Sequence, residues 1–378
     1  MSKQNNRSAL VAGKRWVVKI GSALLTANGR GLDEPAINDW VSQIVALRKS
    51  GKEILLVSSG AVAEGMSRMG WSTRPPELFA QQAAAAIGQT GLIHAYERAF
   101  RGHDLHTAQI LLTHDDLANR KRYLNARSTL GKLLSWGVVP IINENDTVAY
   151  DELRFGDNDT LAAMVANLID ADLLVILTDQ AGLYEADPAT NPGAQLLQEV
   201  VAGDPALIEM ASSRSGSGLG RGGMATKVQA ASLAARSGAA TCVVSGKEAN
   251  ILKRVAEADS VGTCFHPESE PLAARKQWLM SQHKVQGSVV LDAGAVKYLQ
   301  QAGSSLLSVG VIDVQGRFER GDLITCQSEE GEIIAQGFAN YSSQNAMKIK
   351  GQASEKIEAV LGYVDEPELI HRNNLVLL

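Results

Sequence analysis

The strongest constraint on the fold is a regular alternation between short β-branched runs and longer segments with helical periodicity, from Arg15 to about Cys264. Near-continuous apolar strands that alternate with helices indicate a mostly parallel sheet, because such strands are buried on both faces. We therefore predict an α/β fold in which helices sandwich a mostly parallel sheet. The expected strands are 16–20, 54–57, 138–142, 173–177 and 241–244, and the expected helices are 35–49, 78–100, 121–136, 161–169 and 224–236.

The sequence changes character after this region. The stretch from His266 to Lys284 is polar and contains two prolines, so we expect a linker there. From Val285 short apolar runs are separated by glycines, which is typical of a small, mainly-β domain. The predicted organisation is therefore a catalytic domain over 1–265, a linker over 266–284, and a small mainly-β domain with the C-terminal tail over 285–378.

Charge, apolar runs and cysteines exclude several classes of protein. A net charge of −5 provides no general attraction to nucleic acids or anionic membranes. The chain begins with a polar segment that is unlike a signal peptide, and no apolar run reaches the roughly 18 residues of a membrane span. Cys242, Cys264 and Cys326 are far apart in the sequence, which argues against a zinc site and against a disulfide framework. We expect a cytoplasmic protein without a membrane partner.

Five clusters of small and polar residues follow the predicted strands or begin the helices after them. Ligands of open α/β sheets bind beyond the carboxyl ends of the strands, so the shared position of the clusters predicts a single site. The clusters are KIGS at 19–22, SSGA at 58–61, NEND at 143–146, GDND at 156–159 and TD at 178–179.

Two lysines and a serine suggest phosphate chemistry, although each has a structural alternative. Lys19 either contacts phosphate oxygens or is a solvated residue at the end of a strand. Ser59 leads into a helix, and it either caps that helix or leaves its N-terminus open to an anion. Lys227 lies in the first turn of a predicted helix, where the helix dipole disfavours a cation unless a polyphosphate is bound nearby. The glycine-rich run 216–227 that it ends does not fit the P-loop pattern, and its alternative is a flexible linker.

The amide and acidic residues point to a ligand with an amino group or to phosphate-bound magnesium. Asp157 or Asn158 either caps a helix or, together with Asp159, orders Mg²⁺ and water around phosphates or binds an amino group. The NEND cluster is either a turn or a set of oxygen-rich side chains that suits a ligand with an ammonium group. All seven histidines lie outside the clusters, which disfavours Ser/His/Asp hydrolysis. A carboxylate acceptor is already ionised at neutral pH and needs no base, so the residues favour phosphoryl transfer from ATP to a carboxylate.

The ordered set of motifs resembles the amino-acid kinase family, and within it the glutamate 5-kinases that carry a C-terminal PUA domain. The motifs are VVKIGS, VSSGAVAEG, AAIGQTGL, VPIINENDTV, FGDND, LLVILTDQAGLY and SGSGLGRGGMATKVQAA, followed by GRFERGD and LGY in the tail. The resemblance implies that ATP and L-glutamate give ADP and L-glutamyl 5-phosphate with Mg²⁺, the first step of proline biosynthesis. It also implies feedback inhibition by proline and a homo-oligomer, either a dimer or a tetramer.

The resemblance also implies a role for individual residues. Lys19 and Lys227 would neutralise charge on the transferred phosphoryl group, and Asp159 would organise both lysines. Ser59, Asp146, Asn158 and, as a lesser candidate, Asn143 would bind glutamate. No side chain is assigned as a direct metal ligand, because Mg²⁺ is expected mainly on the nucleotide phosphates and water. The nucleotide-binding residues would be Lys19, Thr178, Asp179, Arg221, Gly222, Gly223, Met224, Ala225, Thr226 and Lys227.

Two other interpretations stay open at this point. The first is another member of the superfamily that phosphorylates a different acceptor, such as N-acetylglutamate, aspartate, carbamate or an isoprenoid phosphate. Asp146 and Asn158 favour glutamate, because a free α-amino group needs acidic partners, whereas an acetylated or phosphate substrate does not. The second is an inactive kinase-like protein that associates with RNA through its PUA domain. Lys19, Lys227, Asp157 and Asp159 are all present, which counts against it.

The charge of the C-terminal region also argues against RNA. From Val285 to Leu378 there are 7 Lys and Arg residues and 12 Asp and Glu residues, whereas the first 284 residues carry 29 of each. An acidic domain lacks the counterion-release contribution that drives binding to a phosphate backbone. We therefore predict a structural or regulatory role for this domain, and RNA binding by the isolated domain at physiological salt would contradict that prediction.

Overall fold

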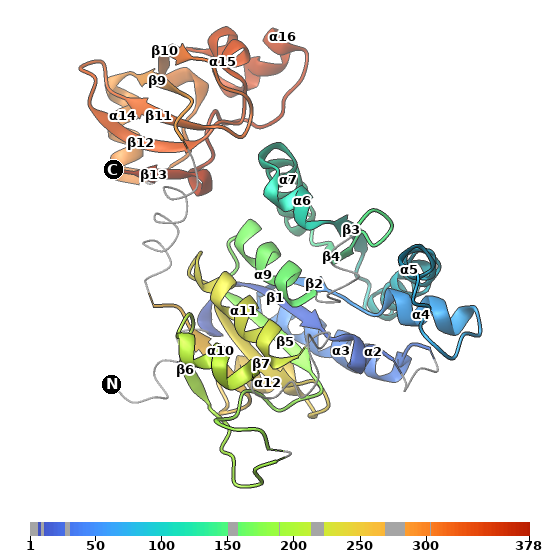
Figure 1. Cartoon of the computed structure of the whole chain (residues 1–378). Helices are drawn as coiled ribbons and strands as arrows, with labels where there is room; N and C mark the ends of the chain where they lie inside the picture. Colours follow the sequence, from blue (N-terminus) through green and yellow to red (C-terminus); the bar gives the residue numbers. More distant parts are fainter. Residues whose placement is uncertain are drawn as a thin grey trace. The chain divides into compact units, whose positions relative to one another are not determined.

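The computed structural model describes residues 7–8, 11–26, 31–149, 158–188, 190–212, 223–268, 284–302 and 304–378. The chain forms two compact units, each built around its own sheet (Figure 1). The first unit contains Met1–Leu117 and Arg127–Ala274, and the second contains Ala118–Ala126 and Arg275–Leu378. The predicted domain limits at 265 and 285 stay predictions, and most of the predicted linker lies outside the described residues.

An eight-stranded sheet forms the centre of the first unit. All five predicted strands are present in it with limits shifted by one or two residues. Three further strands were not predicted because they are short or, like the edge strand of residues 107–112, only partly buried. The strands are β1 Arg15–Ile20, β2 Glu53–Val57, β3 Thr107–Leu112, β4 Val139–Glu144, β5 Leu173–Thr178, β6 Glu199–Val201, β7 Ala240–Ser245 and β8 Thr263–His266.

The strand order is β3-β4-β2-β1-β5-β7-β8-β6, and only β7 and β8 pair in antiparallel fashion. The prediction of a mostly parallel sheet is therefore confirmed. Strand β1 is at the centre, with β2 on one side and β5 on the other. Strands β3, β4, β2, β1, β5 and β7 are parallel to one another, so their carboxyl ends lie along one edge of the sheet.

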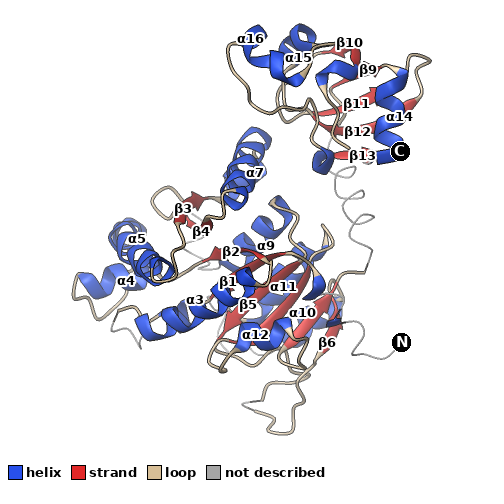
Figure 2. Ribbon diagram, turned by 180° about the vertical axis from the view of Figure 1, so that it is seen from behind, coloured by secondary structure: helices blue, strands red, loops and turns tan. Residues whose placement is uncertain are grey.

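Helices cover both faces of this sheet (Figure 2). On one face Trp16, Val18 and Ile20 of β1 pack in the same hydrophobic core as Trp40 and Ile44 of a helix. Side chains alternate along a strand, so Lys19 points to the other face. The helices of this unit are α2 Ser22–Leu25, α3 Glu34–Lys49, α4 Ala61–Arg68, α5 Leu78–Arg101, α6 His114–Ala118, α7 Arg120–Ser135, α9 Asn158–Leu168, α10 Pro205–Ser212, α11 Met224–Ala235 and α12 Ile251–Ala256, with α7 divided between the two units.

The helices form two layers. Residues of α3, α5 and α12 share the core that contains Trp16, whereas α9 and α11 contact each other and the opposite face of β1 and β5. Helices α4 and α5 lie side by side and approach each other closely (Figure 1). A Cβ atom on Gly88 would overlap the backbone of Ala61 and Gly65, and one on Gly65 would overlap Ala84. Glycine at these two positions therefore sets the separation of α4 and α5.

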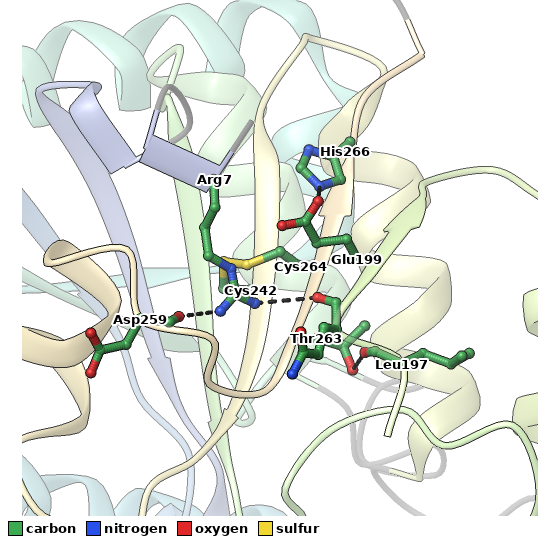
Figure 3. Close-up of a disulfide and its surroundings, with 9 residues drawn as sticks. Arg7, Leu197, Glu199, Cys242, Asp259, Thr263, Cys264 and His266 are labelled. Carbon is green, nitrogen blue, oxygen red and sulfur yellow. Dashed lines mark hydrogen bonds and ion pairs between the residues drawn. A yellow bond between two sulfur atoms is a disulfide. The ribbon is translucent and has the colours of Figure 1, made fainter. Parts of the chain in front are cut away.

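The structure corrects the expectation about cysteines. Cys242 of β7 and Cys264 of β8 are joined by a disulfide, with their Cα atoms 4.3 Å apart (Figure 3). The two residues are direct partners in the antiparallel register, which a spacing of 22 residues does not reveal. The guanidinium of Arg7 covers this region and donates to the carbonyl oxygens of Asp259 and Gln198. The inference from the cysteine spacing against disulfide bonding was therefore wrong for Cys242 and Cys264, while Cys326 is a free, buried thiol.

The second unit contains a five-stranded sheet in the order β10-β9-β11-β12-β13. Its strands are antiparallel except for β9 and β11, and the small mainly-β domain is therefore confirmed. Its core includes Val289, Leu291, Phe318 and Tyr341. Its elements are β9 Gly287–Leu291, α14 Ala293–Ala302, β10 Val311–Gly316, β11 Leu323–Gln327, β12 Ile333–Phe338, α15 Ser343–Ile349, α16 Ile357–Leu361 and β13 Leu375–Leu377, with short 3₁₀ turns at Ser308–Gly310, Ser354–Lys356 and Arg372–Asn374.

Among the helices that the structure describes, none combines the length and the apolar character that a membrane span requires.

Candidate active site

The carboxyl ends of four adjacent strands bring the predicted clusters together. In the register of the sheet Lys19 lies between Val57 of β2 and Ile176 of β5, and Val57 pairs with Ile142 of β4. The site residues just beyond these positions therefore follow the order β4, β2, β1, β5. Three strand spacings of about 4.8 Å separate β4 from β5, which gives roughly 14 Å between the two sides. The predicted acceptor residues lie on one side of Lys19 and the predicted nucleotide residues on the other.

Three buried charged residues connect the central strand β1 to helices α9 and α11. Lys19 forms an ion pair with Oδ1 of Asp159, and Lys227 forms one with Oδ2 at 3.0 Å. Asp159 is fully buried, and both lysines are 4% exposed. The Thr226 hydroxyl lies 3.2 Å from the same Oδ2 atom and 2.7 Å from the carbonyl oxygen of Gly223. The structure therefore brings together the three residues that were predicted to be catalytic.

The charge state of Asp159 follows from its neighbours. Burial alone would raise the pKa of this carboxyl, but the two ammonium groups and their hydrogen bonds outweigh burial and hold the pKa well below its usual range. Asp159 is therefore an anion at neutral pH, and each of its oxygens faces a cation. A carboxylate held in this way orients the lysines and is a poor proton acceptor.

An ion pair within the protein compensates the position of Lys227, whether or not a polyphosphate is bound nearby. Lys227 is the fourth residue of α11, where the helix dipole disfavours a cation. In the structure the carboxylate of Asp159 compensates this unfavourable position directly. Asp159 itself lies in the first turn of α9, where the dipole favours an anion. The ion pair therefore links the N-terminal turns of α9 and α11. The helix dipole favours the charge of Asp159 in α9 and disfavours that of Lys227 in α11.

A network of amides connects the residues that were predicted to bind the acceptor. The side-chain nitrogen of Asn158 donates to the carbonyl oxygen of Ser58 at 2.6 Å and to Oδ1 of Asn143 at 2.7 Å. Asn143 Oδ1 also accepts from the backbone N–H of Glu144 at 3.0 Å. The nitrogen of Asn143 donates to Oε1 of Gln89 on α5 at 2.7 Å. Asn158 therefore joins β2, β4 and α9 at one point.

The network also fixes which end of Asn158 faces outward. The oxygen of Ser58 is a backbone carbonyl and can only accept, so the amide nitrogen of Asn158 must face it. Both hydrogen bonds use that nitrogen, and the Oδ1 atom of Asn158 remains as the end that can accept an N–H from a ligand. An ammonium group is the kind of donor that this atom suits.

The other predicted acceptor residues lie at the same edge. Ser59 is half-buried and precedes Gly60, whose φ of 88° is in the left-handed region that glycine adopts without strain. The N-cap residue of α4 is Gly60, and no side-chain hydrogen bond caps this helix, so Ser59 does not cap it as the first alternative expected. Asp146 is half-buried in the turn that follows β4.

The nucleotide side is only partly described. Thr178 is buried at the end of β5, and its hydroxyl lies 3.2 Å from the side chain of the exposed Asp179. Gly223, Met224, Ala225 and Thr226 form the start of α11 beside Lys227. Arg221, Gly222, Asp157 and Gly156 lie outside the described residues. This side therefore consists of a strand end and a helix N-terminus, an arrangement that suits anionic phosphates.

Within the described part of the chain, no group of three or more His, Cys, Asp or Glu side chains is placed to hold a metal ion. The carboxylate nearest to the centre, Asp159, has both oxygens on lysine ammonium groups. These residues do not fit a metal held by the protein alone.

Sequence reasoning included Ser58 in the SSGA cluster but gave it no role, and it did not assign Gln89 to the site. Ser58 contributes through its backbone carbonyl, which no side-chain pattern signals. Gln89 belongs to the helix predicted at 78–100, to which the sequence analysis gave no role in the site. The sequence feature that could have identified Gln89 is its position in the AAIGQTGL motif. It directly follows Gly88, the glycine at which α5 approaches α4 closely.

Comparisons with known proteins find similar proteins over nearly the whole chain. The amino acid kinase family model matches residues 14–245, and a PUA domain model matches residues 287–361. A glutamate 5-kinase from Thioalkalivibrio sulfidiphilus is 58% identical over 372 residues, which cover 98% of this chain and 99% of that protein. A glutamate 5-kinase from Nitrosococcus oceani is 59% identical over 374 residues, covering 99% of this chain and 100% of that protein. Among solved structures, a UMP kinase from Bacillus anthracis aligns with 68% of this chain and 97% of its own, with 13% identity and a TM-score of 0.46.

Substitution of Asp159 by Asn tests the buried charges through stability. At pH 7 it leaves two buried ammonium groups without their anion, and we expect a loss of about 3 kcal/mol or more in the free energy of unfolding. Because the pKa of Asp159 is depressed in the folded state, its stabilising contribution is fully present above the unfolded pKa of about 4. It is lost as the pH falls toward the lower folded pKa. The difference between wild type and variant should therefore shrink below about pH 4, by about 1.4 kcal/mol per pH unit.

The measurement is urea unfolding of both proteins between pH 7 and pH 3. Glu97→Gln is the matched control, because Glu97 forms an exposed ion pair with Arg101 and should contribute no more than about 0.5 kcal/mol. A difference between wild type and Asp159→Asn that is the same at pH 7 and pH 3 would contradict the depressed pKa.

Proposed function

The chain belongs to the amino acid kinase family, and we propose that it transfers the γ-phosphoryl group of ATP to the side-chain carboxylate of L-glutamate. The product is L-glutamyl 5-phosphate, the first intermediate of proline biosynthesis. The relatives named glutamate 5-kinase are aligned over almost their whole length, so both the kinase region and the PUA domain are shared with them.

The observation that supports this function best is the position of Lys19, Asp159 and Lys227. Lys19 is on β1, the middle strand of the site, and it meets Lys227 of α11 at Asp159 of α9. This position is between the strands that carry the residues proposed for the acceptor and those proposed for the nucleotide. The three buried groups carry a net charge of +1, which favours a polyphosphate. Both ammonium groups are thus held where negative charge accumulates on the transferred phosphoryl group.

The reaction needs little beyond positioning and neutralisation of charge. A carboxylate oxygen of glutamate attacks the γ-phosphorus, the bond from this phosphorus to the bridging oxygen breaks, and the electron pair leaves with ADP. The acceptor has a pKa of about 4.3 in solution and has no proton to lose at neutral pH. Asp159 therefore serves to orient Lys19 and Lys227, which agrees with its two ion pairs and its lowered pKa.

The amide network provides a binding site for the amino group of glutamate. Asn158 presents Oδ1 as an acceptor, because its nitrogen is used by Ser58 and Asn143. The carboxylate of Asp146 adds the negative charge that an ammonium group requires. Ser59, at the start of α4, is proposed to bind a carboxylate of glutamate together with the N-terminus of that helix.

ATP is proposed to bind between Thr178, Asp179 and the N-terminus of α11, including Gly223 to Lys227 and the undescribed Arg221 and Gly222. Mg²⁺ is proposed to reach the site on the phosphates of ATP, because the described carboxylates do not form a metal site by themselves. When bound, it would neutralise charge on the β- and γ-phosphates.

Other parts of the prediction stay proposals. These are feedback inhibition by proline, assembly into a homo-oligomer, a cytoplasmic location, and a PUA domain that does not bind RNA. The acidic composition of the C-terminal region supports the last of them.

The proposed function predicts a specific product. ATP, Mg²⁺ and L-glutamate should yield an acyl phosphate that hydroxylamine traps as a hydroxamate, and added proline should suppress it. N-acetylglutamate and aspartate are the control acceptors, since the first lacks a free amino group and the second is one methylene shorter. Turnover of another acid without any product from glutamate would contradict the proposed acceptor, and no turnover with any acid would favour an inactive kinase-like protein.

The division of the site predicts opposite effects for two substitutions. Lys227→Ala should lower kcat by about 100-fold or more with a small effect on the KM for glutamate, because the charge that Lys227 meets grows in the transition state. Asp146→Ala should raise the KM for glutamate by about tenfold or more and leave the KM for ATP unchanged, because it removes a partner of the amino group.

Steady-state kinetics of both variants checks this prediction. Lys253→Ala is a matched control for Lys227, because Lys253 is an exposed lysine in a surface ion pair on α12. An unchanged kcat in Lys227→Ala would remove this lysine from the chemistry. An unchanged KM for glutamate in Asp146→Ala would place the amino-acid pocket elsewhere.

A further inference from the structure

Helix α5 carries a line of three polar side chains, Gln82, Gln89 and Tyr96. They are spaced seven residues apart, and seven residues make almost two turns of an α-helix, so all three lie on the same side. We call this line the α5 stripe. None of its members belongs to the clusters that indicated phosphoryl transfer.

Each member of the α5 stripe contacts a different segment of the acceptor side. The side chain of Gln82 donates to the carbonyl oxygen of Ala149 at 3.0 Å, just after the turn that carries Asp146. Gln89 accepts from the amide of Asn143 at 2.7 Å, at the end of β4. The hydroxyl of Tyr96 lies 3.1 Å from the hydroxyl of Ser58, at the end of β2. The stripe therefore contacts both strand ends and the loop that together form the proposed pocket.

These contacts extend to the residue that faces the ligand. Gln89 holds the nitrogen of Asn143, while Asn143 Oδ1 accepts from Asn158. Tyr96 holds Ser58, whose backbone carbonyl accepts from the same nitrogen of Asn158. Asn158 thus has two anchors, and each anchor ends on α5. Because α5 belongs to the helix layer opposite α9, the two layers are connected through the pocket and not only through the sheet.

The helix is a firm support for such contacts. The close approach of α4 and α5 at Gly65 and Gly88 restricts sliding of α5 along its own axis. Tyr96 is fully buried, and burial raises the pKa of its hydroxyl, so the group is neutral and can donate or accept a hydrogen bond to Ser58.

We propose that the α5 stripe is the positioning surface of the amino-acid pocket, and that Gln89 sets the affinity for the acceptor by orienting Asn143 and, through it, Asn158. This inference rests on the proposed function. Gln82, Gln89 and Tyr96 act through Asp146, Asn143, Asn158 and Ser58, and they take no part in the transfer of the phosphoryl group. Among the described residues, no hydrogen bond joins the stripe to the residues proposed for the nucleotide.

Gln89→Leu in the full-length protein is the direct test. It removes the acceptor for the Asn143 amide and keeps a similar volume. We expect the KM for glutamate to rise about tenfold, because a buried donor loses its partner, while kcat and the KM for ATP change less than about twofold. Glutamate should also raise the Tm of this variant less than that of wild type at the same concentration, a readout that does not require turnover.

Gln81→Leu is the matched control. Gln81 is the same residue type on the same helix and is 6% exposed, but it bonds to the carbonyl oxygen of Pro75 and to Arg74, away from the pocket. A general effect of losing a buried amide on α5 would appear in both variants. The positioning role predicts that Gln81→Leu lowers the Tm without changing the KM for glutamate.

A double-mutant cycle distinguishes positioning from direct contact with glutamate. If Gln89 acts through Asn143, Gln89→Leu should change the KM for glutamate by less than about twofold in an Asn143→Ala background. Additive effects of the two substitutions would overturn the positioning role, as would equal changes in the KM values for glutamate and ATP. If Gln89→Leu does not fold, Gln82→Leu is the second variant, and an unchanged KM for glutamate there would contradict the stripe.

Failure of this inference differs from failure of the proposed function. If wild-type protein forms no hydroxamate from glutamate, the proposed function is wrong. If wild type forms it and Gln89→Leu retains the wild-type KM for glutamate, only the role of the α5 stripe is wrong.

Discussion

The structure of the site depends on one buried carboxylate, Asp159, between two lysines. An isolated charge in the interior costs several kcal/mol, so this arrangement exists only where the chain can deliver both cations to one anion. Lys19 comes from the central strand β1, and Lys227 comes from the first turn of α11. The two lysines can meet at Asp159 only if β1, α9 and α11 keep fixed positions relative to one another. The same relation places two ammonium groups at the centre of the site and leaves Asp159 without a role as a base.

The strand order places Lys19 between the two groups of residues proposed to bind the substrates. Because β1 lies between β2 and β5, the residues proposed for the acceptor on β2 and β4 and those proposed for the nucleotide on β5 lie on opposite sides of Lys19. The two sides are built differently. The nucleotide side uses a strand end and a helix N-terminus, which suit phosphate groups. The acceptor side uses side-chain amides whose hydrogen bonds have a direction, which suits a small molecule that must be distinguished from similar acids.

The network of amides around Asn158 also connects elements that are distant in the sequence. Asn158 begins α9 in one helix layer, and Gln89 and Tyr96 lie on α5 in the other. Parallel strands fix only their own register, whereas this network also connects the two helix layers at the edge of the proposed binding site. The disulfide between Cys242 and Cys264 is a separate connection on β7 and β8, away from these strands in the order of the sheet.

The sequence by itself determined the alternation of strands and helices, the mostly parallel sheet, the mainly-β C-terminal domain and the family, because periodicity and ordered motifs are local properties of the chain. It also identified Lys19, Asp159 and Lys227 as residues of one site. Only the tertiary structure decided which atoms meet: that Asp159 pairs with both lysines, that Asn158 presents its oxygen, that Gln89 supports Asn143, and that two cysteines 22 residues apart are joined. These depend on strand order, register and the crossing of α4 and α5, which are set by contacts between residues far apart in the chain and leave no local pattern.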